Sequence, residues 1–238
     1  MTLMKKLLLY ISPKTLFKSE DGHVVIRDEI ENKRPVRLLL YDDIRESGIY
    51  LDEGMNSDPL FYYMQTLKEV MLFYEGLDNA LLIGGGGMAF PKYYLDRVPA
   101  GRITVVEKDA HMVDLARRYF FFEDDDRVSV HIGDGASFIA KKAVDSGAPR
   151  YDFVIFDAFE GKRPPKEITS EGMFKLTKQI MSQDGILAIN MLNKKSGVIS
   201  MQTHLAQAVL KNIFRNTRII NCQMGWNCIL LASDRELK

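Results

Sequence analysis

From residue 79 onward, the chain alternates short apolar runs with stretches of helical periodicity. The apolar runs predict strands near 79–83, 102–107, 127–132, 151–157 and 185–191. Strands that alternate with helices form a parallel sheet with right-handed crossover connections. Two further β-rich runs, 217–222 and 228–231, are joined by a short turn and predict a hairpin. We therefore expect a Rossmann-like, doubly wound α/β sheet that is parallel except for its antiparallel last strand.

The first part of the chain has a different pattern. Charged or glycine-containing turns separate short alternating segments, which is typical of antiparallel strands. These segments lie at 23–27, 36–41 and 48–51. The apolar run at 7–11 also predicts a strand. We expect a small N-terminal β-domain over residues 1–58 and a larger α/β domain over residues 59–238.

Two helices of the larger domain are predicted from apolar residues that recur at helical spacing. A helix over about 59–74 places four apolar side chains on one face: Leu60, Met64, Leu67 and Met71. A helix over about 197–214 does the same with Val198, Met201, Leu205, Val209 and Ile213.

Composition limits the classes of function. Apolar residues make up 46% and charged residues 27% of the 238 residues, enough for a full hydrophobic core. The formal net charge is +0, so nucleic acid and anionic membranes are not expected partners. The N-terminal apolar run is too short for a signal peptide and lacks a cleavage site, which predicts a cytoplasmic protein. Cys222 and Cys228 are expected to be reduced, and the scattered histidines predict no metal site.

Four consecutive glycines, Gly84 to Gly87, follow the first strand of the predicted parallel sheet. Glycine allows a sharp turn and lets a ligand approach bare backbone at the start of a helix. Glu107 ends the next strand, 107 − 84 = 23 residues later, close to the roughly 20 residues typical of such sites. A carboxylate there accepts hydrogen bonds from ribose hydroxyls. Gly84, Gly85, Gly86 and Glu107 therefore predict a site for a ligand that contains adenosine.

Three carboxylates are expected at one edge of the predicted sheet. Glu107, Asp134 and Asp157 lie at the ends of successive strands, and no Lys or Arg lies between Gly84 and Pro91. Such a rim repels a pyrophosphate and attracts a sulfonium or an amine. The charge pattern therefore favours a ligand of the S-adenosylmethionine type over NAD.

Two alternatives to this interpretation remain open. The pattern Gly84-x-Gly86-x-x-Ala89 also fits a dinucleotide-binding loop, which would take NAD. Glu107 and Asp134, taken singly, are equally well explained as helix N-caps, because acidic residues are common there. Only the combination of all features in register favours the nucleoside site.

Four motifs resemble those of the spermidine synthase (polyamine aminopropyltransferase) family. In chain order they are Ile83-Gly84-Gly85-Gly86, Val105-Val106-Glu107-Lys108-Asp109, Gly133-Asp134-Gly135 and Tyr151-Asp152-Phe153-Val154-Ile155-Phe156-Asp157. The resemblance covers roughly residues 45 to 233, and the combination and spacing of these motifs are specific.

The resemblance implies a small β-domain beside a class I methyltransferase-like sheet. It implies that Glu107 holds the ribose of S-adenosylmethionine or its decarboxylated form, and that Asp134, beside Gly135, holds the adenine amino group. Asp157 would be the catalytic base, and the segment 158–165 would close over the substrates. Because family members assemble as dimers or tetramers, the resemblance also implies a homodimer or tetramer.

The chain departs from the family at the groups that recognise amines. Spermidine synthases carry an Asp where this chain has Gly87, and a Tyr-(His/Gln)-Glu triplet where it has Tyr62, Tyr63 and Met64. Glu160 stands where a second Asp follows the catalytic one. Tyr62, Tyr63 and Glu160 are therefore the candidates for the substrate site and its lid. In these departures the chain is similar to the spermidine synthase-like branch of bacterial proteins.

Three hypotheses about function follow. In the first, Asp157 takes a proton from an acceptor amine, which attacks the methylene beside the sulfonium of decarboxylated S-adenosylmethionine. The second is methyl transfer from intact S-adenosylmethionine, which Gly87 favours because the acid that would select the decarboxylated donor is absent. The third is a non-catalytic nucleoside-binding protein. For both reactions the acceptor is expected to be a small molecule of undetermined identity.

Overall fold

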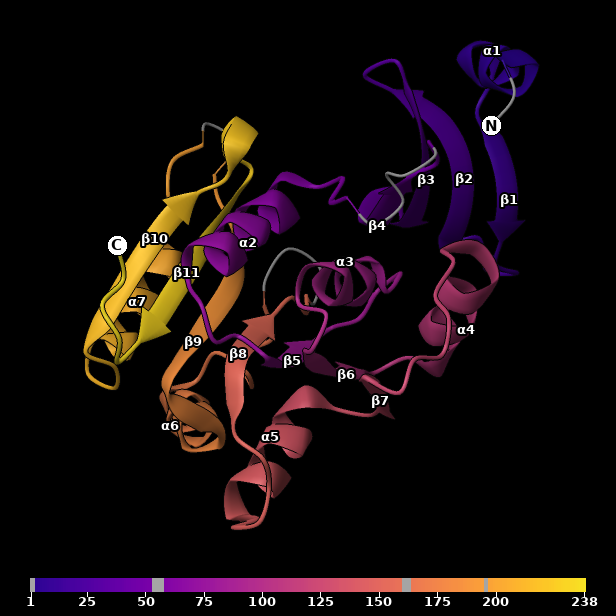
Figure 1. Cartoon of the computed structure of the whole chain (residues 1–238). Coiled ribbons are helices and arrows are strands. Elements are labelled where there is room, and N and C mark those ends of the chain that lie inside the picture. Colours follow the sequence, from indigo (N-terminus) through magenta and orange to yellow (C-terminus); the bar gives the residue numbers. More distant parts are fainter. Residues whose placement is uncertain (1–2, 53–57, 160–163, 195–196) are drawn as a thin grey trace.

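The computed structural model describes residues 3–52, 58–159, 164–194 and 197–238 (Figure 1). Glu160 and the neighbouring residues of the predicted lid, 160–163, lie outside the described residues. Within the described part, the chain forms a four-stranded sheet near the N-terminus and a seven-stranded sheet in the remainder.

The larger sheet has the strand order β10-β11-β9-β8-β5-β6-β7. Its strands are β5 (Asn79–Ile83), β6 (Arg102–Glu107), β7 (Val128–Ile132), β8 (Tyr151–Phe156), β9 (Met181–Leu192), β10 (Asn216–Asn221) and β11 (Asn227–Ser233). Pairing is parallel from β7 to β9, whereas β11 runs antiparallel to both β9 and β10. The predicted doubly wound sheet with an antiparallel last strand is confirmed. Strand order reverses at β5, which lies between β6 and β8, and ligands bind at such a point in open α/β sheets.

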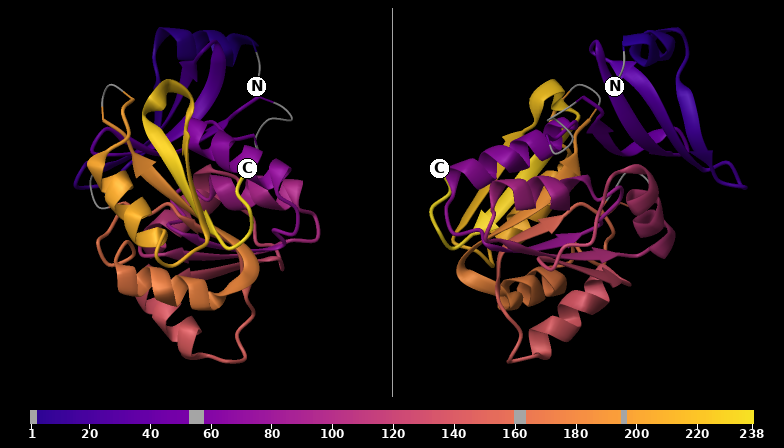
Figure 2. Two further views of the ribbon diagram at one scale, coloured as in Figure 1. Left: turned by 90° about the vertical axis from the view of Figure 1, so that its left-hand side faces the viewer. Right: turned by 45° about the vertical axis from the view of Figure 1, so that its right-hand side comes forward.

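Helices cover both faces of this sheet (Figure 2). One face carries α2 (Tyr62–Phe73), α3 (Ala89–Arg97) and α4 (Ala110–Tyr119), and the other carries α5 (Gly135–Val144), α6 (Glu171–Ile180) and α7 (Met201–Leu210). Successive strand residues point to opposite faces. Phe153 and Val154 on β8 thus belong to different hydrophobic clusters although both are fully buried. The sheet is therefore enclosed on both sides, and its carboxyl edge is left for function.

Helix α7 buries only part of the apolar stripe that the sequence places on one face. Thr203 and Ala206 are buried, whereas Met201 and Leu205 of the apolar stripe are 67% and 61% exposed. The helix begins at Ser200, whose side chain accepts a hydrogen bond from the backbone N–H of Thr203 at 3.2 Å. The small side chains of Thr203 and Ala206 face the sheet and allow close packing. Met201 and Leu205 therefore face solvent in the single chain, whereas Val209 and Ile213 of the same stripe pack partly buried against the core.

The smaller sheet is a simple antiparallel arrangement of β1 (Lys14–Lys18), β2 (Val24–Glu31), β3 (Arg34–Tyr41) and β4 (Ile44–Tyr50) in that order. Sequence analysis found the last three strands and missed β1. The sheet packs on the end of α4 through a cluster that includes Ile26, Leu39 and Phe120. The Arg37 guanidinium also donates a hydrogen bond to the carbonyl of Tyr119 at 2.6 Å. These contacts hold β4 next to the carboxyl edge of the larger sheet.

The predicted strand at 7–11 is wrong, because these residues belong to the helix α1 (Leu3–Ile11). A short apolar run does not distinguish a strand from a helix by its periodicity. Leucine favours a helix, and β1 already forms the edge of the sheet that a first strand would have joined. Only Leu9 of the run is buried. Over the ranges that the structure describes, every helix is too short or too polar to cross a membrane.

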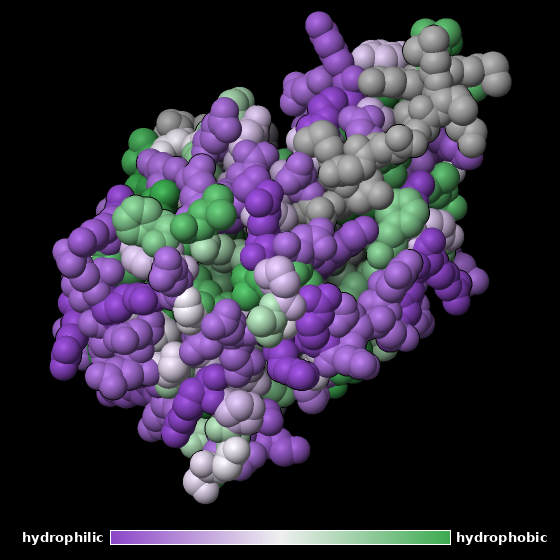
Figure 3. Space-filling model, viewed as in Figure 1, coloured by the Kyte–Doolittle hydropathy of each residue, from purple (hydrophilic) through white to green (hydrophobic). Residues whose placement is uncertain are grey.

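Apolar side chains reach the surface at several places on a mostly hydrophilic molecule (Figure 3). One such place is the turn before β11, a 3₁₀ helix over Gln223–Gly225, where Met224 and Trp226 are 67% and 74% exposed. Cys222 and Cys228 flank this turn as buried free thiols. They belong to clusters on opposite faces of the sheet, so the hairpin does not bring their sulfur atoms together.

Candidate active site

The glycine loop begins where β5 ends, at the reversal of strand order. Gly84 has φ +96°, and a Cβ at this position would lie 2.6 Å from the carbonyl oxygen of Asp157. The backbone N–H of Asp157 donates to the carbonyl of Ile83 at 2.9 Å. Glycine is therefore required at Gly84 for its left-handed conformation and for the contact between the segments that follow β5 and β8.

Glu107 ties this loop to the next strand. Its Oε2 accepts hydrogen bonds from the backbone N–H groups of Gly85 at 2.8 Å and Gly86 at 3.1 Å. Its Oε1 accepts one from the N–H of Asp109 at 3.0 Å. The predicted alternative, that Glu107 caps the helix after β6, is not what the structure shows, because Asp109 caps α4. A carboxylate has about four acceptor positions and these bonds occupy three, so Glu107 retains about one for a ribose hydroxyl.

Asp134 has the capping role that the pattern allowed. It precedes α5 and accepts a hydrogen bond from the N–H of Ser137 at 2.8 Å, and this bond lowers its pKa. Gly135 is buried, and a Cβ there would collide with the side chain of Ile83. Glycine at this position lets the start of α5 approach the end of β5. Binding of adenine by Asp134 stays a prediction.

Asp157 follows β8 and is held by donors on both carboxylate oxygens. The Tyr63 hydroxyl donates to Oδ2 at 2.8 Å, and the Asn190 side-chain amide donates to Oδ1 at 2.8 Å. Burial raises the pKa of Asp157 to about 7, while these two hydrogen bonds oppose the rise and the charge of Glu46 adds to it. Burial also raises the pKa of Tyr63 well above its ordinary value, which keeps the phenol a donor. Asp157 is thus a fixed carboxyl group that exchanges protons near neutral pH.

Two asparagines at this place were missed by sequence analysis. Asn190 lies on β9 and is 2% exposed. Its Oδ1 accepts a hydrogen bond from the Asn227 side-chain amide on β11 at 2.9 Å. The signal in the sequence was a single polar residue inside the apolar run 186–191. A buried polar side chain requires partners, so such a residue points to a polar network.

The smaller sheet also contributes to the site. A Cβ at Gly87 would lie 2.6 Å from Oγ of the buried Ser47, and a Cβ at Gly86 would lie 3.8 Å from the carbonyl oxygen of Glu46. Glu46 is exposed to solvent. Partial desolvation by neighbouring protein atoms raises the pKa of its carboxyl group, and the negative charge of Glu107 raises it further. Among the described residues the Glu46 side chain makes no hydrogen bond or ion pair. Strand β4 thus adds an acidic group that sequence analysis did not assign.

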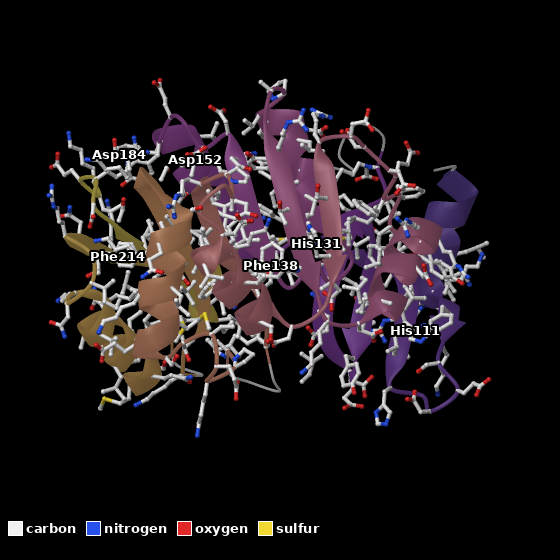
Figure 4. All side chains as sticks on the ribbon, turned by 90° about the horizontal axis from the view of Figure 1, so that it is seen from below. His111, His131, Phe138, Asp152, Asp184 and Phe214 are labelled. Carbon is white, nitrogen blue, oxygen red and sulfur yellow. The ribbon has the colours of Figure 1, made fainter. Side chains whose placement is uncertain are left out.

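The remaining positions considered in the sequence are the two tyrosines of α2, Glu160 and the histidines. Tyr62 begins α2 and is partly buried against the hydrophobic cluster on the face of the sheet that carries α2, α3 and α4. Tyr63, the next residue, donates a hydrogen bond from its hydroxyl to Asp157. Glu160 lies outside the described residues. His111 and His131 lie on different elements, α4 and β7 (Figure 4). In the part of the chain that the structure describes, no group of three or more metal-binding side chains occurs.

The profile of the spermine/spermidine synthase domain family matches residues 60–230, most of the chain. The chain belongs to this family. The match begins just before α2 and ends within β11, so it includes the glycine loop, Glu107, Asp157 and both asparagines.

Two relatives differ in the reactions that their names describe. A polyamine aminopropyltransferase of Vibrio vulnificus is 29% identical over 155 residues, which are 65% of this chain and 48% of that protein. The eEF1A lysine and N-terminal methyltransferase of Bos taurus is 30% identical over 184 residues, which are 72% of this chain and 26% of that protein. The chain spans about half of the first relative and about a quarter of the second.

Two solved structures share the fold. A probable spermidine synthase from Corynebacterium glutamicum has a TM-score of 0.75 and 23% identity, over 94% of this chain and 81% of that one. Human methyltransferase-like protein 13, solved in complex with SAH, has a TM-score of 0.65 and 24% identity, over 75% of this chain and 86% of that one. The predicted family and its methyltransferase-like fold are confirmed.

Proposed function

We propose that this protein is a spermidine synthase-like transferase. It binds S-adenosylmethionine or its decarboxylated form and transfers an alkyl group of the aminopropyl type to an amine acceptor. Family membership supports the reaction class, and Asp157 is the observation that carries the proposal. Its carboxyl group is held beside the glycine loop by two hydrogen bonds of 2.8 Å, and burial raises its pKa to about 7. A base with a pKa near the working pH is suited to proton transfer.

The proposed chemistry requires a carboxylate at this position. A primary amine has a pKa near about 10 and is protonated at neutral pH, so it must lose a proton before it attacks. Asp157 attracts the ammonium and accepts this proton, and the freed lone pair attacks the carbon bonded to the sulfonium. The carbon–sulfur bond breaks and its electron pair stays on sulfur, which leaves as a neutral thioether. Glu46 adds negative charge beside the same reacting groups, which favours a cationic acceptor.

Methyl transfer from intact S-adenosylmethionine is the second candidate. The lack of space at Gly87 favours methyl transfer, because a Cβ there would lie 2.6 Å from Oγ of Ser47. Strand β4 fills the space in which spermidine synthases carry the acid that binds the aminopropyl ammonium. The bovine relative is a methyltransferase by name, and the human structural neighbour was solved with SAH. Both observations support a donor that keeps its methionine carboxylate.

Binding and turnover test the proposal separately. In calorimetry, methylthioadenosine, SAH and NADH are titrated into the full chain, and the adenosyl–sulfur compounds are expected to bind. Binding of NADH alone would contradict the proposed donor. For turnover, each donor is offered with a set of primary amines, and mass spectrometry of the products distinguishes an aminopropyl from a methyl adduct. We expect little or no spermidine from putrescine, because Gly87 and Met64 stand where amine-binding acids would be.

We further propose that the protein forms a homodimer. Strand β1 is an edge of the smaller sheet, and exposed sheet edges are commonly covered by another subunit. The apolar residues Met201, Leu205 and Trp226 are exposed in the single chain, which also supports association. Light scattering at micromolar protein is expected to give twice the chain mass of 27.2 kDa. A mass equal to that of one chain would exclude the dimer.

A further inference from the structure

Four polar side chains, from three elements and the loop after β8, form one continuous hydrogen-bonded series. Asn227 on β11 donates to Asn190 on β9 at 2.9 Å, and Asn190 donates to Asp157 at 2.8 Å. Tyr63 on α2 donates to the other oxygen of Asp157, also at 2.8 Å. Asn227 itself lies at the surface turn, next to the exposed Trp226. The series therefore connects a surface turn to the proposed base.

The hydrogen bond from Asn227 favours one orientation of the Asn190 amide. A side-chain amide has a donor end and an acceptor end, and rotation by half a turn exchanges them. Asn227 donates its N–H to the oxygen of Asn190, so the NH₂ group of Asn190 faces Asp157. The reverse orientation would place an amide oxygen against a carboxylate oxygen. Two acceptors in contact are tolerated only when one of them carries a proton, which would then be Asp157.

The surroundings of Asp157 make this donor important. Desolvation and the charge of Glu46 on β4 both favour the protonated form of Asp157, and only the donors on Asn190 and Tyr63 oppose them. Because Asn190 is 2% exposed, water does not replace the donor if the amide rotates. The protonation of Asp157 is thus sensitive to the orientation of one buried amide.

We propose that Asn227 is a positioning residue, which acts through Asn190 to hold a hydrogen-bond donor on Asp157 and so keeps Asp157 a carboxylate. The inference rests on the proposed function, in which Asp157 is the base. Asn227 touches no reacting atom, and its effect is on the protonation of the residue that does. The backbone of the same turn is held independently, because the Asn193 amide donates to the carbonyls of Gly225 at 3.1 Å and Asn227 at 3.2 Å.

Carbon-13 NMR of the Asp157 carboxyl group in the ligand-free full chain tests this proposal, with the signal assigned from Asp157→Asn. Asn227→Leu removes the donor at nearly constant size. We expect it to raise the titration midpoint of Asp157 by about half a unit to one unit, since hydrogen bonds to the charged form favour that form. Asn227→Asp replaces the donor by an acceptor and rotates the Asn190 amide, so a larger rise is expected. Asn193→Ala alters the same turn outside the series and should leave the midpoint unchanged.

The outcomes are distinct from those of the proposed function. A midpoint that is unchanged in Asn227→Leu overturns the proposal, even if Asn227→Asp raises it, because added charge alone then explains the second result. Equal shifts in Asn193→Ala and Asn227→Leu overturn it as well, because they indicate a general effect of the turn. If Asn227→Leu does not fold, Asn227→Ala at this partly exposed position serves as the neutral variant. The titration uses no donor or acceptor, whereas failure of the proposed function appears as absent adenosyl binding in calorimetry.

Discussion

The nucleoside half and the acceptor half of the site are constructed in different ways. Gly84, Gly85, Gly86 and Glu107 lie within 24 residues of one βαβ unit, counted from 84 to 107, and the loop and carboxylate bond directly. The acceptor half brings together side chains from α2, β4, β9, β11 and the end of β8. The nucleoside half is formed by residues that are close in the sequence, while the acceptor half exists only once the whole sheet has assembled.

Because of this difference, substitutions in the two halves are expected to have different effects. A change in the glycine loop acts on the backbone and therefore on folding as well as on the ligand. A change around Asp157 acts on charge and proton transfer while the backbone keeps its bonds to β5. Substitutions in the two halves should consequently separate ligand affinity, stability and turnover from one another.

The largest expected effect is on turnover, from Asp157→Asn. Loss of a general base lowers kcat by about 10²–10⁴. Affinity for methylthioadenosine should change little, because the base acts on the transition state. Asp152→Asn is the matched control, since Asp152 lies at the opposite end of β8 and accepts a hydrogen bond from the N–H of Asn79 at 3.0 Å (Figure 4). Full activity in Asp157→Asn would show that another group is the base.

The next effect is on stability, from Gly84→Ala. A Cβ at Gly84 would lie 2.6 Å from a backbone oxygen and would need φ +96°, so we expect a loss of about 2–5 kcal/mol in the free energy of unfolding. Gly76→Ala is the control, because Gly76 has φ +72° and nothing lies within 4 Å of its added Cβ. It should cost about 1–2 kcal/mol. Denaturant unfolding measures both, and equal losses would mean that the contact with Asp157 is unimportant.

The same contrast explains how far the sequence could predict the structure. The parallel sheet and glycine loop were predictable because strand periodicity and the backbone requirement of Gly84 leave local signatures. Asn190 leaves only the signal of a polar residue in an apolar run, and Glu46 leaves none, since their roles depend on strands that meet only in the folded chain. Helix α1 was mistaken for a strand because five apolar residues fit either structure.

Helix α7 shows the same limit in packing. Met201 and Leu205 belong to the apolar stripe of this helix yet are exposed, whereas the small Thr203 and Ala206 meet the sheet. Hydrophobic spacing identifies a helix, whereas its rotation depends on contacts that a single sequence does not state.

A smaller effect is expected on affinity, from Glu107→Ala. Hydrogen bonds to a charged acceptor contribute about 1.5–3 kcal/mol each, so methylthioadenosine should bind roughly 10-fold to 100-fold more weakly. Glu107→Gln keeps the size and one acceptor oxygen, and it should lose less affinity. Isothermal titration measures both variants. Unchanged affinity in Glu107→Ala would place the ribose elsewhere.

The smallest effect is a shift of pH dependence, from Glu46→Gln. Asp157 must be deprotonated to act as a base, so turnover should fall as pH drops through its pKa of about 7. The negative charge of Glu46 raises that pKa, and its removal should move the acid limb of kcat to lower pH by a fraction of a unit. Glu20→Gln, in the exposed turn between β1 and β2, removes the same charge far from the site and should leave the limb in place. A shift to higher pH, or the same shift in both variants, would show that Glu46 does not act on Asp157, and the acceptor half would then lack its contribution from the smaller sheet.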